Sequence, residues 1–258
     1  TKAQELQTAL AKEKELNEMR DQFVSMASHE FRTPLTIIDT AAQRLKRKLG
    51  KESLDAEVAA QKIENIRSAV RRMTRLMEST LAAARLNEGK IAIEIASCSP
   101  EMLLHEACTR QAELSPTHQI SCNISRLPVE ISADSGSLEQ SFSNLLSNAV
   151  KYSPSDPRVE IYGWEEASHA IIAVRDHGIG IDKEDLGQIG KKFFRAKTST
   201  GIAGTGIGLN LTKTLVEMHG GSLTISSKAG EGSVFVIRLP IAGPAGQSID
   251  GDSQPQVA

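Results

Sequence analysis

A histidine followed directly by a glutamate stands out in FVSMASHEFRTPLT, residues 23–36, where the apolar residues have helical spacing. Imidazole is a fair nucleophile near neutral pH, because its ordinary pKa is ~6.5 and much of it is neutral. The Glu30 carboxylate can hold the proton of one His29 ring nitrogen and leave the other nitrogen free to attack. Ordinary surface polar residues are the alternative, so the function of this pair depends on what the rest of the chain supplies.

A second group of polar residues lies in NLLSNAVKYSP, residues 144–154. Asn144 and Asn148 are four residues apart and share one helix face, and Lys151 follows on nearly the same face. An amide oxygen can ligate a hard cation such as Mg²⁺, and a lysine ammonium can pair with phosphate oxygens. A solvated polar stripe is the alternative, but the flanking Leu and Val residues favour a helix with one packed side and one side facing a cavity.

Two glycine motifs follow, DHGIGI at residues 176–181 and GTGIGL at residues 204–209. Each places glycines two residues apart, as in a backbone that turns tightly or approaches a ligand closely. Neither is a Walker loop or a good dinucleotide fingerprint, because no Gly-Lys-Ser/Thr follows and KTSTGIA is not a strand. Ordinary loops are the alternative, but a helix that begins at Gly208 would direct its N-terminal amides at phosphates.

The elements that must position these residues change character along the chain. Residues 1–49 are charged and glycine-free, and residues at helical spacing recur at Leu6, Ala9, Glu13, Leu16, Met19, Phe23, Met26 and Glu30. A cleaner run of steps of three and four follows at Ile63, Ile66, Val70, Met73, Met77, Thr80 and Ala84. The segment 50–53 separates the two runs as a helix–helix turn, and Pro34 should bend the first helix just after His29.

Two amphipathic helices in a hairpin cannot bury such stripes alone. We therefore expect a second copy of the chain and a dimeric four-helix bundle. A monomeric coiled-coil stalk is the alternative that periodicity leaves open.

From residue 91 to residue 241, strand and helix patterns are mixed, which predicts an α/β domain. Predicted strands are 91–95, 159–162, 170–176, 223–225 and 234–239, with an extended segment at 120–131. Predicted helices are 100–114, 137–152 and 208–219, and Asp134 is the expected N-cap of the second. The last residues, AGPAGQSIDGDSQPQVA, are rich in Gly, Pro, Ser and Gln and predict a disordered tail.

Composition excludes few classes of function. The 258-residue chain has a net charge of -2, which gives no general attraction to nucleic acid or to an anionic membrane. No apolar run is long enough to span a bilayer, and no signal peptide is evident. Cys98, Cys108 and Cys122 lack metal-ligand spacing, so we expect reduced thiols in a cytoplasmic protein, with redox sensing as the weaker alternative. A chain that starts with Thr1 rather than Met indicates a fragment whose upstream part is missing.

The order of the motifs resembles the catalytic core of bacterial sensor histidine kinases. SHEFRTPL, NLLSNAVKYSP, DHGIGI, KKFFRA and GTGIGL occur in that family's order, and the resemblance extends from about residue 21 to residue 241. It implies a multi-domain fold, in which an all-α hairpin forms the dimeric bundle and an α/β sandwich, the Bergerat-type ATP-binding domain, follows. The implied segments are a coiled-coil signalling helix at 1–21, the dimerisation and histidine phosphotransfer domain at 22–90, the ATP-binding domain at 91–241 and the tail at 242–258.

The resemblance also implies roles for individual residues. His29 matches the phosphoacceptor, Glu30 the acid that activates it, Arg195 a residue that stabilises charge at the γ-phosphate, and Thr33 a residue that accompanies phosphatase activity. Asn148 matches the Mg²⁺ ligand. The implied ATP-binding residues are Asn144, Asn148, Lys151, Tyr152, Asp176, Gly178, Gly180, Phe194, Gly204, Thr205, Gly206, Gly208 and Leu209.

Two positions depart from the family pattern. His177 stands where asparagine is usual, although the adjacent Asp176, which would hydrogen-bond the adenine amino group, is present. Lys191 and Lys192 replace a more acidic approach to the phenylalanines, and the lid before Gly204 is short.

The expected activity is ATP- and Mg²⁺-dependent autophosphorylation of His29, followed by transfer to an aspartate of a response regulator receiver domain. The expected assembly is a homodimer, attached to an upstream sensory domain in a full-length protein that is either soluble or membrane-anchored. Thr33, four residues after His29, either takes part in dephosphorylation of the regulator or only precedes the helix bend at Pro34. A catalytically silent scaffold of the same fold and another Bergerat-type ATPase are the competing hypotheses.

Overall fold

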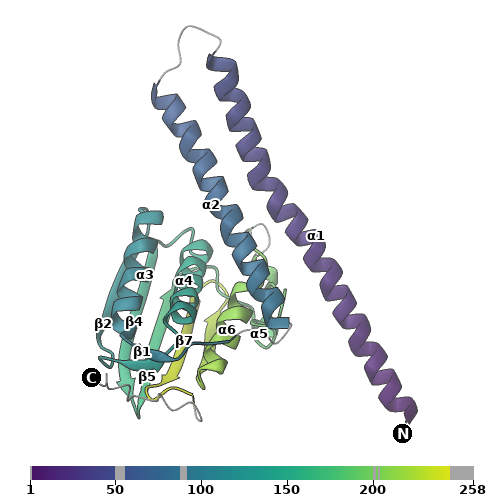
Figure 1. The fold of residues 1–258 in the computed structure, drawn as a ribbon, viewed down its shortest axis with the longest axis vertical. Coiled ribbons are helices and arrows are strands. Elements are labelled where there is room, and N and C mark those ends of the chain that lie inside the picture. Colours follow the sequence, from purple (N-terminus) through teal and green to yellow (C-terminus); the bar gives the residue numbers. More distant parts are fainter. Residues whose placement is uncertain (1, 50–55, 88–91, 200–201, 203, 245–258) are drawn as a thin grey trace, which may run out of the picture. The chain divides into compact units, whose positions relative to one another are not determined.

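The computed structural model describes residues 2–49, 56–87, 92–199, 202 and 204–244 (Figure 1). The chain divides into two compact units, one containing residues 1–90 and the other most of residues 91–258. The predicted turn at 50–53 and nearly all of the predicted tail, residues 245–258, lie outside the described residues. No helix in the described ranges is long and apolar enough to cross a membrane.

The first unit is a hairpin of two long helices, α1 (Lys2–Leu49) and α2 (Ala56–Asn87), which confirms the prediction from periodicity. Helix α1 runs without interruption through residues 21 and 22 and contains Pro34. Ala41 of α1 and Ala69 of α2 are 5% and 4% exposed, so small side chains allow the two backbones to approach each other.

Much of the apolar surface of the hairpin stays exposed. Val70 is 48% exposed and Met77 is 53% exposed, although both belong to the predicted apolar stripe of α2. The other exposed large apolar residues of the hairpin are Leu6, Leu10, Leu35, Ile37, Ile63 and Leu81. Several stripe positions, including Leu16, Phe23 and Ala84, have side chains outside the described part of the structure.

The second unit is an α/β sandwich, as predicted. Five strands form a sheet in the order β2-β4-β5-β7-β6, with β2 and β4 parallel and the other pairs antiparallel. Helices α3, α4 and α6 cover one face of this sheet (Figure 1). The strands are β2 (Gln119–Arg126), β4 (Arg158–Glu166), β5 (His169–Asp176), β6 (Ser222–Lys228) and β7 (Gly232–Pro240). The helices are α3 (Pro100–Leu114), α4 (Ser135–Tyr152), the short α5 (Lys183–Leu186) and α6 (Gly208–Met218), with a 3₁₀ turn η1 at Lys197–Ser199.

The core of this unit lies between the sheet and the helices. Leu138, Phe142 and Leu145 of α4 are 0% exposed, as are Ile161 of β4 and Ile172 of β5. These side chains belong to one cluster that joins α3, α4, α6 and the sheet. The unit therefore buries a continuous core within one chain.

Two predicted extended segments differ from the structure. A strand at 91–95 is wrong, because residues 92–95 are irregular and β1 (Ala96–Cys98) begins only after them, paired with β3 (Ile131–Ala133). The physical reason is that the Glu94 N–H donates to the Asp134 carboxylate at 2.7 Å instead of to a strand. The predicted extended segment 120–131 is interrupted after Arg126, where the Leu127 N–H turns back to the Ile124 carbonyl at 3.1 Å.

Candidate functional site

Helix α4 carries the polar face on which the candidate nucleotide site is built. Its N-terminus is capped as predicted, because the Asp134 carboxylate accepts a 2.7 Å hydrogen bond from the Ser137 N–H. Helix α4 begins two residues earlier than predicted, at Ser135. Its apolar side is fully buried against the sheet, whereas Asn144 and Asn148 are half-buried. The helix is therefore rigidly positioned and keeps its amides partly accessible.

Asn144 holds the start of α6 against α4. Its side-chain Nδ2 donates to the Gly208 carbonyl at 3.0 Å and to the Thr212 hydroxyl at 3.3 Å. A Cβ added at Gly208 would lie 3.1 Å from the Asn144 side-chain oxygen, so glycine allows this approach. These contacts give Asn144 a structural task beside the predicted nucleotide contact. Sequence reasoning missed Thr212 as a partner of Asn144. The signal that could have found it is its position one helical turn after Gly208.

The other end of α4 contacts the first glycine motif. The Ile179 N–H donates to the Tyr152 carbonyl at 3.0 Å, and a Cβ on Gly178 would lie 2.0 Å from that oxygen. Glycine is therefore required at this close approach. The Lys151 ammonium donates to the Tyr152 hydroxyl at 2.7 Å and lies 4.2 Å from the ring centroid.

Asn148 lies midway between these two contacts. Asn144, Asn148 and Tyr152 follow one another at one-turn intervals on α4, so Asn148 is about 6 Å along the axis from each. Within the described ranges its amide makes no hydrogen bond to another residue. The structure thus places an accessible amide between the start of α6 at Gly208 and the loop at Gly178.

Asp176 is a buried carboxylate at the end of β5, only 3% exposed. Burial raises the pKa of this carboxyl above its ordinary value of 3.8, while hydrogen bonds from Gly178 and Ser233 act to lower it. The Gly178 N–H donates to Oδ1 at 2.9 Å. A buried carboxylate that keeps acceptor capacity fits the predicted recognition of an exocyclic amino group. Ser233 was not predicted as a partner, although it lies in the GEGSV stretch.

Gly180 shows what the second glycine of this motif does. It has φ +64, and a Cβ there would lie 2.0 Å from the Lys228 carbonyl. The neighbouring Ile179 carbonyl accepts from Gly230 at 2.8 Å, and the Ile181 N–H donates to the Ser227 hydroxyl at 2.9 Å. The close approach observed is therefore to the turn between β6 and β7, and it fixes the loop that follows Asp176.

His177 has a charged partner that sequence reasoning missed. Its Nε2 lies 2.8 Å from Glu160 Oε2, and the Arg175 guanidinium lies 3.8 Å from the same carboxylate. The Tyr162 hydroxyl donates to Glu160 at 3.1 Å. His177 holds the pKa of the Glu160 carboxyl below its ordinary value of 4.5. Strand alternation was the available signal, because Glu160 and Arg175 are register partners on β4 and β5.

The segment after α5 is organised by Arg195 and Asp185. An Arg195 Nη2 donates to the Ser199 carbonyl at 3.1 Å and also to the Ile202 carbonyl. The Lys197 N–H donates to the Asp185 carboxylate at 2.8 Å. The Arg195 Nε is buried and has no hydrogen-bond partner among the described residues. The guanidinium thus holds this loop together. Its role in stabilising charge at a phosphate stays a prediction.

The remaining predicted nucleotide residues have mixed environments. Leu209 packs against the apolar core of the unit, which gives it a structural role. Phe194 is half-buried and follows Phe193, whose φ of +65 is unusual for a residue with a Cβ. Gly204, Thr205 and Gly206 are half-buried, and the Thr205 hydroxyl accepts from the Ile207 N–H at 3.4 Å.

The predicted phosphoacceptor lies on α1. His29 and Glu30 are both in this helix, but their side chains are outside the described part of the structure. Thr33 is half-buried and Pro34 is buried, one turn further along. Beyond the proline, the Thr36 hydroxyl donates to the Arg32 carbonyl at 2.9 Å.

Comparison with known proteins identifies the class of each unit. Residues 133–243 match the family described as histidine kinase-, DNA gyrase B-, and HSP90-like ATPase. Residues 19–89 match the His Kinase A (phospho-acceptor) domain. The first matched range includes α4, Asp176 and both glycine motifs, and the second includes His29.

Individual relatives cover most of the chain. The circadian input-output histidine kinase CikA of Synechococcus elongatus is 33% identical over 93% of the chain, and the chain covers 32% of CikA. The sensor histidine kinase YkoH of Bacillus subtilis is 31% identical over 88% of the chain, which covers 49% of YkoH. The chain thus spans about a third to a half of the length of these relatives.

Solved structures agree in fold. Full-length ShkA in complex with AMPPNP matches 87% of the chain and 46% of ShkA, with a TM-score of 0.60 and 26% identity. Histidine kinase ThkA in complex with response regulator protein TrrA matches 91% of the chain and 67% of the ThkA chain, with a TM-score of 0.58 and 20% identity. The chain is therefore a histidine kinase catalytic core, with a phospho-acceptor domain followed by an ATPase domain.

Proposed function

We propose that this core binds ATP in its α/β unit, phosphorylates His29 and passes the phosphoryl group to an aspartate of a response regulator. In the first step, an imidazole nitrogen attacks the γ-phosphorus and ADP leaves. Glu30, next in sequence, is the acid that holds the proton of the other ring nitrogen. The solved complex of ThkA with TrrA supports a receiver domain as the acceptor of the second step. A cytoplasmic site of action fits a reaction that consumes ATP.

The observation that carries this proposal is the placement of α4 between two anchored loops. Asn144 fixes the start of α6 at Gly208, and the Tyr152 carbonyl fixes the loop at Gly178. A nucleotide whose adenine meets Asp176 can extend along α4 past Asn148 toward the N-terminus of α6. Oriented backbone N–H groups at a helix N-terminus stabilise phosphate oxygens.

The residues present also fit a magnesium ion. Asn148 offers an amide oxygen, a hard ligand of the type that Mg²⁺ prefers, and Mg²⁺ neutralises charge on the phosphates when bound. Among the described residues, no group of three or more His, Cys, Asp or Glu could hold a metal ion. One amide ligand together with substrate phosphates is the arrangement expected of Mg²⁺ in kinases. Lys151, one turn beyond Asn148, supplies a positive charge on the same face of α4.

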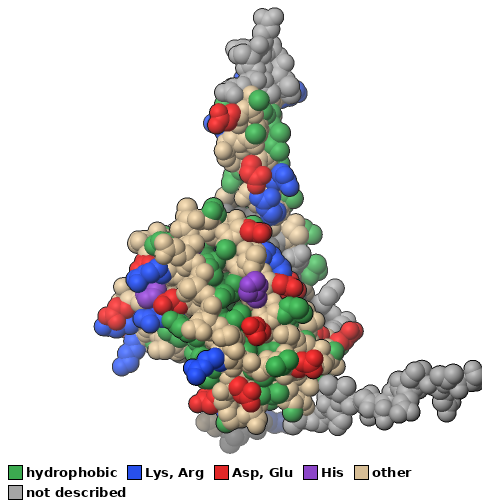
Figure 2. Space-filling model, turned by 90° about the vertical axis from the view of Figure 1, so that its left-hand side faces the viewer, with side chains coloured by type: hydrophobic (Ala, Val, Ile, Leu, Met, Phe, Trp, Pro, Cys, Tyr) green, Lys and Arg blue, Asp and Glu red, His purple; other side chains and the backbone are tan. Residues whose placement is uncertain are grey.

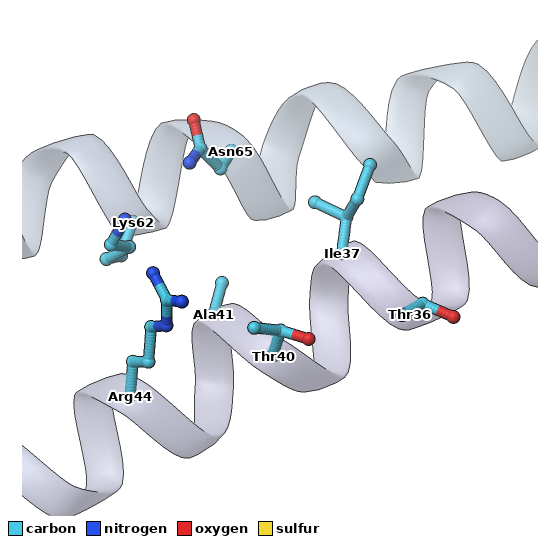
Figure 3. Close-up of a pocket in the computed structure, with 7 residues that line it drawn as sticks. All are labelled: Thr36, Ile37, Thr40, Ala41, Arg44, Lys62 and Asn65. Atoms are coloured by element: carbon cyan, nitrogen blue, oxygen red, sulfur yellow. The ribbon is translucent and has the colours of Figure 1, made fainter.

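The dimer belongs to the same proposal. A cavity of about 210 Å³ lies between α1 and α2, lined by Thr36, Ile37, Thr40, Ala41, Arg44, Lys62 and Asn65 (Figure 3). The exposed Ile37 lines it from α1, next to the buried Ala41 (Figure 3). A second hairpin packed on the exposed apolar side chains of α1 and α2, Ile37 among them, would remove these side chains from water. This supports the dimeric four-helix bundle predicted from periodicity.

Labelling with γ-labelled ATP and Mg²⁺ tests the reaction. The chain should acquire label that is lost in acid and kept in base, as phosphohistidine is, and His29→Gln should acquire none. Nucleotide affinity of His29→Gln should equal that of the parent, because the substitution is outside the ATPase domain. A chain that binds ATP without label would be the silent scaffold, and hydrolysis without label would indicate another type of ATPase.

Thr33 is proposed to act in dephosphorylation of the regulator, through a hydroxyl that orients the attacking water. It lies four residues after His29 on α1, and therefore on the same side of the helix. Thr33→Ala should label His29 at the parental rate but dephosphorylate the regulator about 100-fold more slowly, the low end of the contribution typical of a side chain that positions a proton transfer. Equal dephosphorylation rates would leave Thr33 only the structural role of preceding Pro34.

A further inference from the structure

Two cysteines lie at the same level of consecutive elements in the α/β unit. Helix α3 ends at Leu114 and strand β2 begins at Gln119, so the two elements run back along each other after a short turn. Cys108 lies six residues before the end of the helix, about 9 Å from it at 1.5 Å per residue. Cys122 lies three residues after the start of the strand, about 10 Å along it. The two side chains therefore project at equal distances from the turn.

Both cysteines lie on the faces where α3 and β2 pack together. Cys108 is 6% exposed and belongs to the inner side of α3 with Leu104 and Ala107. Ile120, Cys122 and Ile124 occupy every second position of β2 and therefore share one face of the strand. Because Ile120 and Ile124 pack in the core, this is the inner face.

The surroundings of the pair differ between the two thiols. Strand β2 is an edge strand of the sheet, and Cys122 is exposed, whereas Cys108 is buried. Figure 2 shows the molecule from the side on which α3 and β2 lie in Figure 1, with charges of both signs among apolar side chains. Solvent therefore reaches one member of the pair and not the other.

The two thiols also interact. The neighbouring Cys108 thiol lowers the pKa of Cys122, and the neighbouring Cys122 thiol, together with burial, raises the pKa of Cys108. The exposed sulfur is thus the one that ionises first, and the buried sulfur keeps its proton and lies against it. A thiolate in contact with a second thiol is the usual arrangement of a redox-active cysteine pair.

We propose that Cys108 and Cys122 are a hydroperoxide-reactive pair that closes to a disulfide between α3 and β2. The Cys122 thiolate attacks one oxygen of hydrogen peroxide, which breaks the O–O bond, gives a sulfenic acid and releases hydroxide. The Cys108 sulfur then attacks the Cys122 sulfur, and the hydroxyl leaves as water with the proton of the Cys108 thiol. The proton lost earlier from Cys122 converts the released hydroxide to water, so one peroxide and two thiols give one disulfide and two waters. This chemistry does not rest on the proposed kinase activity.

Cys98 provides an internal control. It lies on β1, half-buried, with its sulfur 3.9 Å from the Ala133 carbonyl, and burial raises its pKa. It is the third free cysteine of the chain and has no cysteine partner in the described structure. Cys98 should therefore stay reduced at peroxide concentrations that oxidise the pair.

Peptide mapping tests the proposal directly. The native chain is treated with hydrogen peroxide, remaining thiols are alkylated, and the protein is digested without reduction by a protease that cleaves after glutamate. Cleavage after Glu101, Glu106 and Glu113 places the three cysteines on three different peptides. The expected product is one cross-linked pair of peptides, 107–113 and 114–130, with two hydrogens fewer than their sum, and an alkylated Cys98. Separate Cys108 and Cys122 peptides, alkylated or carrying added oxygen, would overturn the proposal.

Two variants and a stability measurement complete the test. Cys98→Ser should form the cross-link at the parental rate, and Cys108→Ser should leave Cys122 as a sulfenic acid that a dimedone probe traps. Closing a loop of this length should raise the midpoint of thermal unfolding by about 5 °C or more in the oxidised parent, and dithiothreitol should reverse the rise. A cross-link that forms only in denaturant, or no dimedone adduct in Cys108→Ser, would reject the pair as a native redox site.

Discussion

The two units of this chain use apolar residues in opposite ways. In the α/β unit, Leu138 and Phe142 of α4 are 0% exposed, and one cluster joins three helices to the sheet. In the hairpin, Ile63, Val70 and Met77 of α2 are about half exposed, although they belong to an equally regular pattern. The two helices of a hairpin cannot cover all of their apolar surface with their own side chains. Apolar periodicity therefore predicts a buried face in both units, but only the sandwich completes it within one chain.

The largest effect is expected at the exposed apolar stripe of α2, where the two units differ most. Val70→Asp combined with Met73→Asp should convert the proposed dimer to monomers, because two charges would be placed in an apolar seam. Light scattering measures the mass, and nucleotide affinity of the α/β unit should be unchanged. Ser68→Asp is the matched control, since this exposed residue is outside the stripe and should keep the dimer. A dimeric double variant would show that the interface is elsewhere.

The fold was predictable from the sequence where the signals are local, and not where they depend on distant partners. Helix α3 has the predicted bounds, and α4 and α6 differ from prediction by at most two residues, because caps and periodicity are local signals. The strand expected at 91–95 fails because strand formation depends on a partner, and the N–H of Glu94 is bound by the Asp134 carboxylate. No local pattern reports a contact forty residues away.

The candidate site divides in a similar way. The close approach of the glycines after Asp176 could be predicted, since two closely spaced glycines are a local pattern typical of a loop that approaches a ligand or another backbone. The role expected for Asp176 itself came from the resemblance. The contacts of Asn144 with Gly208 and of His177 with Glu160 could not be predicted, because they join segments that only the sheet topology brings together. The role expected for Arg195 came from resemblance alone, and its guanidinium is bound to loop carbonyls.

The next largest effect concerns the closed core of the sandwich. Phe142→Ala should reduce the free energy of unfolding of the α/β unit by about 3–5 kcal/mol, because the side chain is fully buried and its removal leaves a cavity. Urea denaturation measures the change, which should be independent of protein concentration, unlike that of the hairpin variants. Leu114→Ala is the control, since this residue is 53% exposed at the end of α3 and its loss should cost well under 1 kcal/mol, about the level of a surface substitution. Equal losses for the two variants would contradict the core assigned to α4.

A smaller effect is expected at Asp176, the buried acid of the sandwich that is proposed to bind the adenine amino group. Asp176→Asn should weaken ATP binding by roughly 5- to 150-fold, the cost of about 1–3 kcal/mol for an unpaired buried group, because the amide can present a donor to the adenine amino group. A binding titration measures the affinity, and the secondary structure should be unchanged. Unchanged affinity would remove Asp176 from the site.

The same variant tests the pKa of this carboxyl without any ligand. Since burial raises the pKa of Asp176 above 3.8, its ionised form costs folding free energy. The cost is absent below pH 3.8 and complete above the raised value, so the stability of the parent relative to Asp176→Asn should fall as pH rises through this window. A difference that does not change with pH would show that the carboxyl titrates normally.

The smallest effect is expected at Glu160, on the surface beside the site. Its pKa is lowered from 4.5, first by His177, so the carboxylate contributes stability that is present above pH 4.5 and lost as pH falls through the lowered value. The side chains of His177 and Glu160 are 17% and 29% exposed, and solvent screening limits the gain. Glu160→Gln should therefore cost less than about 1 kcal/mol at pH 7 and nothing below the lowered pKa.

Denaturation of parent and variant at several pH values measures this difference, with Glu165→Gln as the control on the exposed part of the same strand. Arg175 and Tyr162 also face the Glu160 carboxylate and stabilise its negative charge independently of His177. Part of the difference should accordingly persist in His177→Asn, which places the family's usual residue beside Asp176. If His177→Asn instead abolishes the whole difference and leaves ATP affinity unaltered, the pair stabilises only the neighbouring strands β4 and β5, and the loop after Asp176 is positioned by its glycines alone.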